Sequence, residues 1–432
     1  MLYDLPKKFI ENMQKQLPQT EWEVFFATYK NKPYKGVRLN PLKGEKAKMQ
    51  ALLPFLGEGI AWEENGFYTE AEKVGANPFH AAGLFYSQEP SAMSAAPLLE
   101  VKAGERVLDL CSAPGGKGTQ LACKMQGEGI IVLNEPVENR AKILLQNVER
   151  LGIKNAVVTC ETPRRLAEKF PAYFDKILVD APCSGEGMFR KNADEALSEW
   201  SEENVALCAR RQKEILDEGT KMLRGGGLLV YSTCTFAVEE DEKQVEDYLR
   251  SHPYMRLIKM EKLYPHKIKG EGHFVALFVR EDEQNALPLK TAKASVTQTA
   301  RKAYADFEKD FFHRLFVGNL HEVNGVLYDL PSGVFDWRGL QVLRVGVRLG
   351  EVKNGRFEPS HALATCVKKV DCKRVVDLSQ TDGRLEKYFR GETLEAEIEN
   401  GWCVVCVEGY PLGLGKAVNG VVKNHYPKGL RR

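Results

Sequence analysis

Two cysteines and one aspartate stand directly after apolar segments of the sequence and could do chemistry together. Asp180 and Cys183 follow the apolar residues 177–179, and Cys234 follows a second apolar segment, residues 228–231, fifty-one positions beyond Cys183. Both segments are typical of buried parallel strands. Because open α/β sheets bind ligands at the carboxyl ends of their strands, we expect the carboxylate and the two thiols to converge on one crevice.

A glycine-rich segment, residues 109–118, joins a predicted strand to a predicted helix that starts at about Lys117. Gly115 and Gly116 allow backbone amides to approach a ligand closely, and the amino terminus of a helix favours a carboxylate or a phosphate. A P-loop is disfavoured because Cys111 stands where that motif requires glycine, and the Gly-x-Gly-x-x-Gly fingerprint of dinucleotide sites is absent. The segment therefore predicts a ligand of another kind.

A carboxylate stands where a ribose diol would bind. Glu135 ends the next predicted strand, twenty residues after Gly115, close to the spacing at which nucleotide-binding folds place such an acid. A ribose-bearing cofactor that is not a dinucleotide points to S-adenosylmethionine. We expect this cofactor at the glycine-rich segment.

Two thiols and an acid beside a methyl donor match the requirements of cytosine carbon-5 methylation. Carbon-5 is a poor nucleophile until a thiolate adds to carbon-6 and converts the ring into an enamine. An acid near N3 would stabilise the developing charge, and a base must later remove the carbon-5 proton. Asp180, Cys183 and Cys234 fit this scheme, but the residues alone leave the two thiols interchangeable. Lys117 is a candidate for stabilising the thiolate.

The other cysteines are interpreted as core residues. Cys403 and Cys406 have the spacing of a redox motif or of half a zinc site, but in a strand they would face opposite sides. The sequence has no second pair at zinc-site spacing, so we predict no metal. The remaining six are also expected to be buried: Cys111, Cys123, Cys160, Cys208, Cys366 and Cys372.

The chain's length and composition indicate a globular protein of several domains. Its 432 residues allow about two to four domains. Its apolar runs are shorter than the roughly 20 residues that cross a bilayer, and residues 1–8 lack the residue order of a signal peptide. We therefore expect a cytoplasmic protein with reduced cysteines and no association with a membrane.

The charge of the chain is unevenly distributed. Residues 1–50 carry +5 and residues 411–432 carry +5, which leaves the middle at −8 for a total of +2. Basic ends around an acidic middle suggest a polyanion bound from two sides, although solvated surface charge is a simpler reading of the charges alone.

Strands alternate with helices between residues 106 and 279, which predicts a doubly wound, mostly parallel α/β sheet. The expected strands are 106–110, 130–133, 156–159, 174–180, 228–232 and 273–279, and the main helices are 137–151, 202–223 and 239–250. Beyond a polar linker, strands such as 325–328, 340–345 and 402–407 indicate a β-rich region. We expect domains at 1–95, 96–282, 301–370 and 371–432, with the linker at 283–300.

These motifs resemble the RNA cytosine carbon-5 methyltransferases of the Nol/Nop/Sun type, in particular the bacterial 16S ribosomal RNA methyltransferase F subgroup, and the resemblance covers nearly the whole chain. The segments 109–118, 180–184 and 233–235 resemble its cofactor, acid/second-cysteine and nucleophile motifs. Residues 38–43 resemble its N-terminal RNA-contacting unit, and residues 86–91 resemble the entry to its catalytic domain. The tail, residues 413–416 and 423–429, is similar to its PUA-like RNA-binding domain.

The resemblance implies a Rossmann-like methyltransferase domain with a seven-stranded sheet, a small N-terminal α+β unit and a β-rich, PUA-like C-terminal region. It also implies that Cys234 is the nucleophile, that Cys183 assists product release, and that Asp180 contacts both cofactor and base. Where the family often has an aspartate for the adenine, this chain has Thr162. The implied cofactor residues are Cys111, Ser112, Ala113, Pro114, Gly115, Gly116, Lys117, Glu135, Thr162 and Asp180.

The expected substrate is cytosine in small-subunit ribosomal RNA, either free or in an assembling particle, and no obligate protein partner is evident. One alternative is a DNA cytosine methyltransferase that attacks with Cys183. Another is a non-catalytic RNA-binding assembly factor, but such a protein would not need Asp180, Cys183 and Cys234 together.

Overall fold

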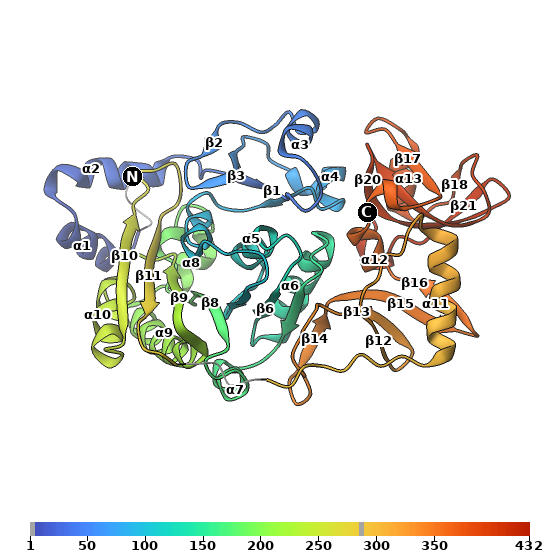
Figure 1. The fold of residues 1–432 in the computed structure, drawn as a ribbon. Helices are drawn as coiled ribbons and strands as arrows, with labels where there is room; N and C mark the ends of the chain where they lie inside the picture. Colours follow the sequence, from blue (N-terminus) through green and yellow to red (C-terminus); the bar gives the residue numbers. More distant parts are fainter. Residues whose placement is uncertain (1–4, 285–288) are drawn as a thin grey trace.

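The computed structural model describes residues 5–284 and 289–432 (Figure 1). The predicted linker and the residues examined for a signal peptide therefore lie partly outside the described residues. Among those described, no helix is long and apolar enough to cross a membrane.

A central eight-stranded sheet forms the middle of the molecule. Its order is β10-β11-β9-β8-β5-β6-β7-β14. The five strands from β9 to β7 are parallel to their neighbours, whereas β10, β11 and β14 pair antiparallel. The strands are β5 (Arg106–Asp109), β6 (Ile130–Asn134), β7 (Ala156–Thr159), β8 (Phe174–Asp180), β9 (Leu223–Thr233), β10 (Met255–Leu263), β11 (His273–Arg280) and β14 (Val342–Val345).

Helices cover both faces of this sheet, which is why the middle parts of the central strands are apolar on both sides. Along β8, Ile177 and Val179 belong to the core on one face and Leu178 to the core on the other. The first core is closed by α7 (Pro163–Lys169), α9 (Glu202–Met222) and α10 (Glu242–Ser251), and the second by α5 (Gly116–Lys124) and α6 (Glu138–Arg150). The predicted helices and strands of this domain are present, and Ser201 caps α9 by accepting a hydrogen bond from the Asn204 amide.

One strand of the sheet comes from the C-terminal half of the chain. The sequence predicted a strand at 340–345 within the appended β-rich region, but β14 pairs with β7 as an eighth strand of the central sheet. The buried Arg344 secures this edge by donating from Nη2 to the Ile153 carbonyl at 2.6 Å. The hydrophobic pattern of a sequence predicts a strand but not the strand with which it pairs. For this reason the sheet has eight strands, one more than the seven that the family resemblance implied.

The N-terminal unit packs over the carboxyl edge of the central sheet (Figure 1). Its four-stranded sheet has the order β2-β3-β1-β4. Its helices and strands are α1 (Lys7–Gln16), α2 (Gln19–Ala27), β1 (Gly36–Leu39), α3 (Lys46–Leu52), β2 (Gly59–Ile60), β3 (Glu63–Tyr68), α4 (Pro78–Ala81) and β4 (Phe85–Ser87).

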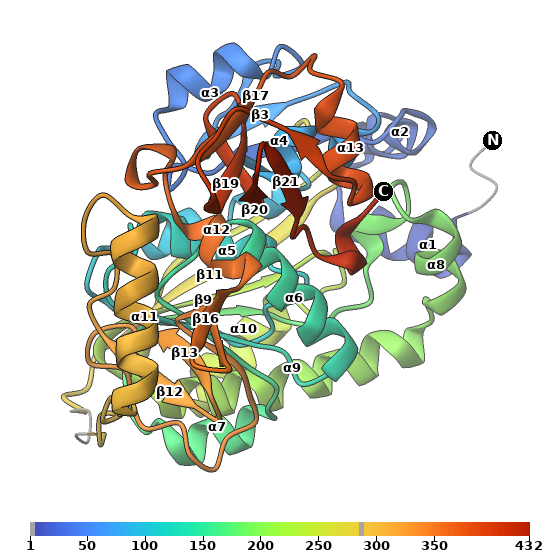
Figure 2. The ribbon, with the colours of Figure 1, turned by 90° about the vertical axis from the view of Figure 1, so that its right-hand side faces the viewer.

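The C-terminal region contains two further sheets, with α11 (Gln298–Phe311) alongside them (Figure 2). The first sheet has the order β12-β13-β15-β16, and the second β17-β19-β20-β21-β18. The elements are β12 (Leu320–Val323), β13 (Val326–Asp329), β15 (Val347–Lys353), β16 (Arg356–Pro359), α12 (His361–Cys366), β17 (Val375–Leu378), α13 (Arg384–Arg390), β18 (Leu394–Glu395), β19 (Gly401–Val407), β20 (Tyr410–Val418) and β21 (Val421–Asn424).

Strand β19 joins two cores of this region. Cys403 is buried in the core shared with the N-terminal unit, whereas Cys406 is buried in the core under α11. The prediction that these two cysteines face opposite sides of a strand is confirmed. The described residues contain no cluster of side chains that could hold a metal ion.

Candidate active site

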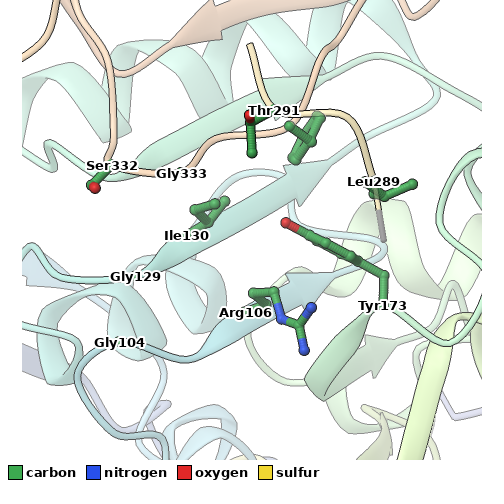
Figure 3. A pocket seen from close by; sticks show the side chains of 10 residues that line it. Gly104, Arg106, Gly129, Ile130, Tyr173, Leu289, Thr291, Ser332 and Gly333 are labelled. Carbon is green, nitrogen blue, oxygen red and sulfur yellow. The ribbon is translucent and has the colours of Figure 1, made fainter. Parts of the chain in front are cut away.

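Cavities lie at both edges of the central sheet, but only one is lined by groups suited to the predicted chemistry. The cavity at the amino edge has a volume of about 400 Å³ and is lined by glycines together with Arg106, Tyr173 and Phe335 (Figure 3). Arg106 stacks on the Tyr173 ring at 4.7 Å and pairs with Asp175. None of the described residues that line this cavity is a cysteine, so it lacks the thiol that the predicted chemistry requires.

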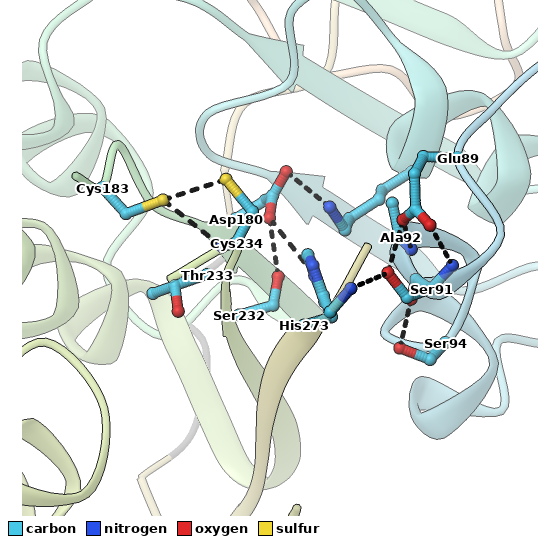
Figure 4. Close-up of polar contacts among 12 residues, drawn as sticks. Glu89, Ser91, Ala92, Ser94, Asp180, Cys183, Ser232, Thr233, Cys234 and His273 are labelled. Atoms are coloured by element: carbon cyan, nitrogen blue, oxygen red, sulfur yellow. Dashed lines mark hydrogen bonds and ion pairs between the residues drawn. The ribbon is translucent and has the colours of Figure 1, made fainter. Parts of the chain in front are cut away.

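The two predicted thiols meet at the opposite, carboxyl edge of the sheet (Figure 4). The parallel register places Asp180 on β8 beside Ser232 on β9, so the loops after the two strands start side by side. The Sγ atoms of Cys183 and Cys234 are 3.2 Å apart, and the Cys234 amide donates to the Cys183 Sγ at 3.3 Å. The hydrogen bond with Cys234, together with burial, raises the pKa of the Cys183 thiol well above its usual range.

Asp180 and Lys117 form an ion pair beside these thiols. Lys117 Nζ lies 2.8 Å from Asp180 Oδ2, and Ser232 Oγ donates to Asp180 Oδ1 at 2.8 Å. Burial by itself lowers the pKa of the Lys117 ammonium, but the Asp180 carboxylate outweighs this effect and the pKa is raised. Lys117 is therefore a fixed positive charge at neutral pH.

A cavity of about 280 Å³ lies over this ion pair. Lys117, Asp180 and Cys234 line it, and so do five residues of the predicted cofactor loop or of the strand before it. Cys183 is not among the lining residues, so the two thiols are not equivalent in the folded protein. The loop residues in the wall are Asp109, Ser112, Ala113, Pro114 and Gly116.

The cofactor loop carries buried polar atoms that have no partner among the described residues. Both carboxylate oxygens of Asp109 and the Ser112 hydroxyl are buried and unpaired. Burial raises the pKa of Asp109 to about 7. A Cβ atom on Gly118 would come within 2.6 Å of Asp109 Oδ2 and 2.4 Å of Ser112 Oγ, so this close approach requires glycine. These donors and acceptors fit a cofactor with amine, carboxylate and hydroxyl groups.

Four residues of the predicted cofactor set do not line this cavity, and three of them are Glu135, Thr162 and Cys111. Glu135 is buried, accepts from the Val137 amide at 3.0 Å and pairs with Arg140 at 3.3 Å. Thr162 caps α7 by accepting from the Arg165 amide at 3.3 Å. Cys111 is a thiol whose pKa is raised well above its usual range by burial and by neighbouring carboxylates. All three follow parallel strands at the carboxyl edge, and their roles remain predictions. Gly115, the left-handed residue that begins α5, is likewise absent from the cavity wall.

A carboxylate that the sequence analysis did not identify fixes the loop of Cys183. Glu240 is fully buried, and its Oε2 accepts from the Ser184 amide at 3.0 Å and from Gln212 Nε2 at 2.7 Å. Gln212 also donates to the Pro182 carbonyl at 2.9 Å. Burial raises the pKa of Glu240 to about 7. The loop is therefore held on both sides of Cys183.

The sequence analysis also missed Gln88, Glu89 and His273 in the cavity wall. Residues 86–91 were singled out as a motif, but nothing in a single sequence indicated that they reach the cofactor loop. His273 begins an apolar strand, where a histidine has no spacing relationship to the other site residues. The pairing of β11 with β9 brings it to the site.

The fold and this site define the class of the protein as a Rossmann-like methyltransferase. Family descriptions match the chain in four parts: the N-terminal domain of 16S rRNA methyltransferase RsmF at residues 5–90, 16S rRNA methyltransferase RsmB/F at 96–289, the RsmF rRNA methyltransferase first C-terminal domain at 306–367 and the methyltransferase RsmF PUA domain at 373–432. The chain belongs to the RsmF family of 16S rRNA methyltransferases.

Individual relatives agree with this assignment. The chain is 32% identical to the ribosomal RNA small subunit methyltransferase F of Vibrio vulnificus (strain YJ016), over 99% of this chain and 98% of the relative. A methyltransferase homologue from Pyrococcus horikoshii is 27% identical, with a TM-score of 0.58 over 65% of this chain and 97% of that one. NSun6 from Pyrococcus horikoshii with SFG shares the fold, with a TM-score of 0.59, 22% identity and coverage of 65% of this chain and all 100% of that one.

The resemblance seen in the motifs, the fold class and the expectation of a PUA domain are thus confirmed. So is the prediction that the cofactor is S-adenosylmethionine.

Proposed function

We propose that this chain methylates carbon-5 of cytosine in 16S ribosomal RNA through a transient covalent bond between Cys234 and carbon-6. The observation that carries the proposal is the position of Cys234 in the wall of one cavity with Lys117 and Asp180, with Cys183 at 3.2 Å and outside that wall. The bound S-adenosylmethionine supplies an electrophilic methyl group, and Asp109, Ser112 and the loop around Gly116 are the residues that would hold it.

The surroundings of the two thiols support Cys234 as the nucleophile. Lys117 is buried beside it, and a negative charge at Cys234 contributes to the raised pKa of Lys117, so the cavity holds a positive charge next to this thiol. Cys183 has a different setting, since its hydrogen bond with Cys234, its burial and, with a smaller effect, Glu240 raise its pKa and favour its protonated form. The geometry thus favours the assignment that the family resemblance implies over the reversed one.

The bonds and protons of the cycle can be assigned to these residues. The Cys234 sulfur adds to carbon-6, and Asp180 lies where it can bind the N3–N4 edge of the ring as charge develops. Carbon-5 then gains a methyl group and holds one proton too many. Cys183, acting as the base in its thiolate form, takes that proton, and the electrons of the broken carbon–hydrogen bond re-form the ring double bond as the carbon-6–sulfur bond breaks. The Cys234 thiolate is thereby regenerated, and Cys183 loses the proton to solvent.

RNA binding is proposed to involve the parts of the chain outside the catalytic domain. The target base must leave its stack, at a cost of a few kcal/mol, and phosphate contacts help to offset it. A groove of about 770 Å³ runs between the N-terminal unit, the catalytic domain and the C-terminal region. We call it the lysine groove; its charged residues are Lys43, Lys48, Lys154, Lys368 and Lys369, with Glu45 as the acid.

We propose that the protein consists of domains at residues 1–95, 96–282, 301–370 and 371–432. We also propose that it acts on ribosomal particles in the cytoplasm.

The test is methylation by the purified protein with labelled S-adenosylmethionine on three substrates: 16S rRNA transcript, small ribosomal subunits from a strain lacking the gene, and duplex DNA. We expect label in RNA only, and bisulfite sequencing should locate one or more 5-methylcytosines that disappear in the deletion strain. Label in duplex DNA would favour the reversed thiol roles, and binding of RNA without label would indicate an assembly factor; either result would refute the proposal.

A further inference from the structure

His273 lies on β11, the strand adjacent to β9, whose end carries the proposed nucleophile Cys234. It is the first residue of β11, which pairs antiparallel with β9 in a register that joins Phe274 to Thr233. Continued by one residue, this register would place His273 opposite Cys234, which directly follows β9. Opposed side chains on one face of an antiparallel pair have Cβ atoms about 5 Å apart, and both residues line the same cavity.

The imidazole of His273 is buried without a hydrogen-bonding partner. Its exposure is 1%, and neither Nδ1 nor Nε2 has a partner among the described residues. Asp180 Oδ1 lies 4.0 Å from Nε2, which is too far for a hydrogen bond. Buried polar groups are almost always satisfied, so an exception that lines a binding cavity indicates a group reserved for a ligand.

The backbone before His273 is fixed in place, so the ring is positioned rather than free. Glu89 accepts from the Glu271 amide at 2.9 Å, and Ser91 Oγ accepts from the Gly272 amide at 3.2 Å. Gly272 has φ 109°, and a Cβ atom there would lie 2.3 Å from the ring of Phe236. The backbone conformation at the start of β11 is therefore fixed, and it directs the imidazole toward Asp180.

We propose that His273 forms a hydrogen bond to the target pyrimidine when that base enters the cavity, and so completes the base-binding site begun by Asp180. This inference rests on the proposed function. The base is favoured over the cofactor as its ligand because Cys234 must reach carbon-6 of the ring, and His273 is its cross-strand neighbour. The cofactor loop enters the cavity from β5, two strands beyond β9.

The chemistry of a neutral imidazole suits this role. Burial, with a smaller effect of Lys117, lowers the pKa of His273 well below its usual range. A neutral ring offers one N–H donor and one nitrogen acceptor, and the edge of cytosine offers both acceptors and an amino donor. A charged ring would instead compete with Lys117 for Asp180.

The test compares H273F, which keeps an aromatic ring but no hydrogen-bonding atom, with H273Q, which keeps a donor and an acceptor. Small ribosomal subunits from the deletion strain serve as substrate, and a 16S transcript containing 5-fluorocytidine traps the covalent adduct. We expect H273F to bind S-adenosylmethionine like the wild type while kcat and the rate of adduct formation fall about tenfold, the effect of one lost hydrogen bond to a desolvated group. H273Q should recover part of the rate. His321→Phe, a histidine in β12, is the matched control.

Three results would overturn the inference. They are an unchanged rate in H273F, an equal loss of S-adenosylmethionine affinity and rate, or a rate in H273Q no better than in H273F while both melt at the wild-type temperature. If H273F melts at a lower temperature than the wild type, H273Q is compared with the wild type instead. The methylation rate and the affinity for S-adenosylmethionine are then measured for these two proteins in the same way. If the wild type itself methylates no cytosine, the proposed function fails first, and this outcome is distinct from an active wild type with an equally active H273F.

Discussion

The Cys183 and Cys234 sulfur atoms lie 3.2 Å apart, yet only Cys234 faces the cavity that contains Lys117 and Asp180. The residues alone made the two thiols interchangeable. The fold distinguishes them. Cys183 lies in the loop after β8, the strand that carries Asp180, whereas Cys234 lies at the end of the neighbouring strand β9. This asymmetry is what a cycle with one attacking and one assisting thiol requires.

Substituting each thiol in turn should therefore give opposite results. Cys183→Ala should accumulate a covalent RNA–protein adduct, because the nucleophile remains but release is impaired, whereas Cys234→Ala should give neither adduct nor methylated RNA. Denaturing gel electrophoresis with labelled RNA measures the adduct. Cys208→Ala, which removes a buried thiol of α9 outside the cavity, is the control. An adduct in Cys234→Ala and none in Cys183→Ala would reverse the assignment.

Asp109 should make the stability of the cofactor-free protein depend on pH. Burial raises its pKa from 3.8 to about 7, so the folded form binds this proton more tightly than the unfolded form. The associated stability is present at pH below 3.8 and is lost as pH rises to about 7, with an upper bound of about 4 kcal/mol. Asp109→Asn should lack this loss, so its stability advantage over the wild type should grow from pH 5 to pH 8 in thermal or urea unfolding.

The same Asp109→Asn variant should bind S-adenosylmethionine at least about tenfold more weakly in calorimetry, because a buried carboxylate with no partner is the group the cofactor would satisfy. Asp306→Asn, which changes an exposed aspartate of α11 outside the cavity, is the control. Undiminished affinity in Asp109→Asn, or a stability difference that does not change with pH, would contradict the interpretation.

The sequence was sufficient to predict the residues whose position depends on strand ends. A buried strand was expected before Asp180 and another before Cys234, and parallel strands bring their carboxyl ends together, so the meeting of these residues followed from local pattern. The opposite orientation of Cys403 and Cys406 followed from the two-residue period of a strand. Each of these predictions needed only short-range geometry.

The features that were not predicted depend on pairing between distant segments. β14 was recognised as a strand, but its partner β7 lies more than 180 residues earlier in the chain. His273 reaches the site through the register of β11 on β9, and Glu240 reaches the loop of Cys183 through a side-chain hydrogen bond. No spacing rule links these residues to the motifs, because tertiary packing alone decides which strands and loops become neighbours.

The lysine groove gives a prediction about salt dependence. Lys154 and Lys368 are exposed on its walls, one from the catalytic domain and one from the C-terminal region. Replacing both with glutamate should weaken binding of 16S rRNA and lower the slope of log affinity against log salt by roughly 1 to 2, since each phosphate contact contributes about 0.7 to 0.9. Affinity for S-adenosylmethionine should not change. Lys243→Glu, an exposed lysine of α10 outside the groove, should leave the slope unaltered, and a groove variant with the wild-type slope would exclude this surface.

Glu240 should matter for the release of the product more than for the attack. Its carboxylate accepts from the Ser184 amide and from Gln212, and thereby fixes the backbone on both sides of Cys183, whereas Cys234 is held by its own strand. In Glu240→Gln the amide oxygen can still accept from both donors, but the two bonds lose the assistance of the carboxylate charge, which weakens each of them by roughly 1 kcal/mol. We expect adduct formation within about threefold of the wild type and adduct resolution at least about tenfold slower, as measured by single-turnover methylation together with gel analysis of the adduct.

The exposed neighbour Glu239→Gln is the matched control for Glu240→Gln, because it removes the same charge one residue away without touching the loop. If adduct formation and resolution slowed equally in Glu240→Gln, the residue would be supporting the whole site rather than Cys183. If neither slowed, the buried carboxylate would serve the fold alone. In the proposed cycle Cys183 serves resolution and Cys234 serves the attack, so only a selective loss of resolution would fit a carboxylate that positions one thiol of the pair.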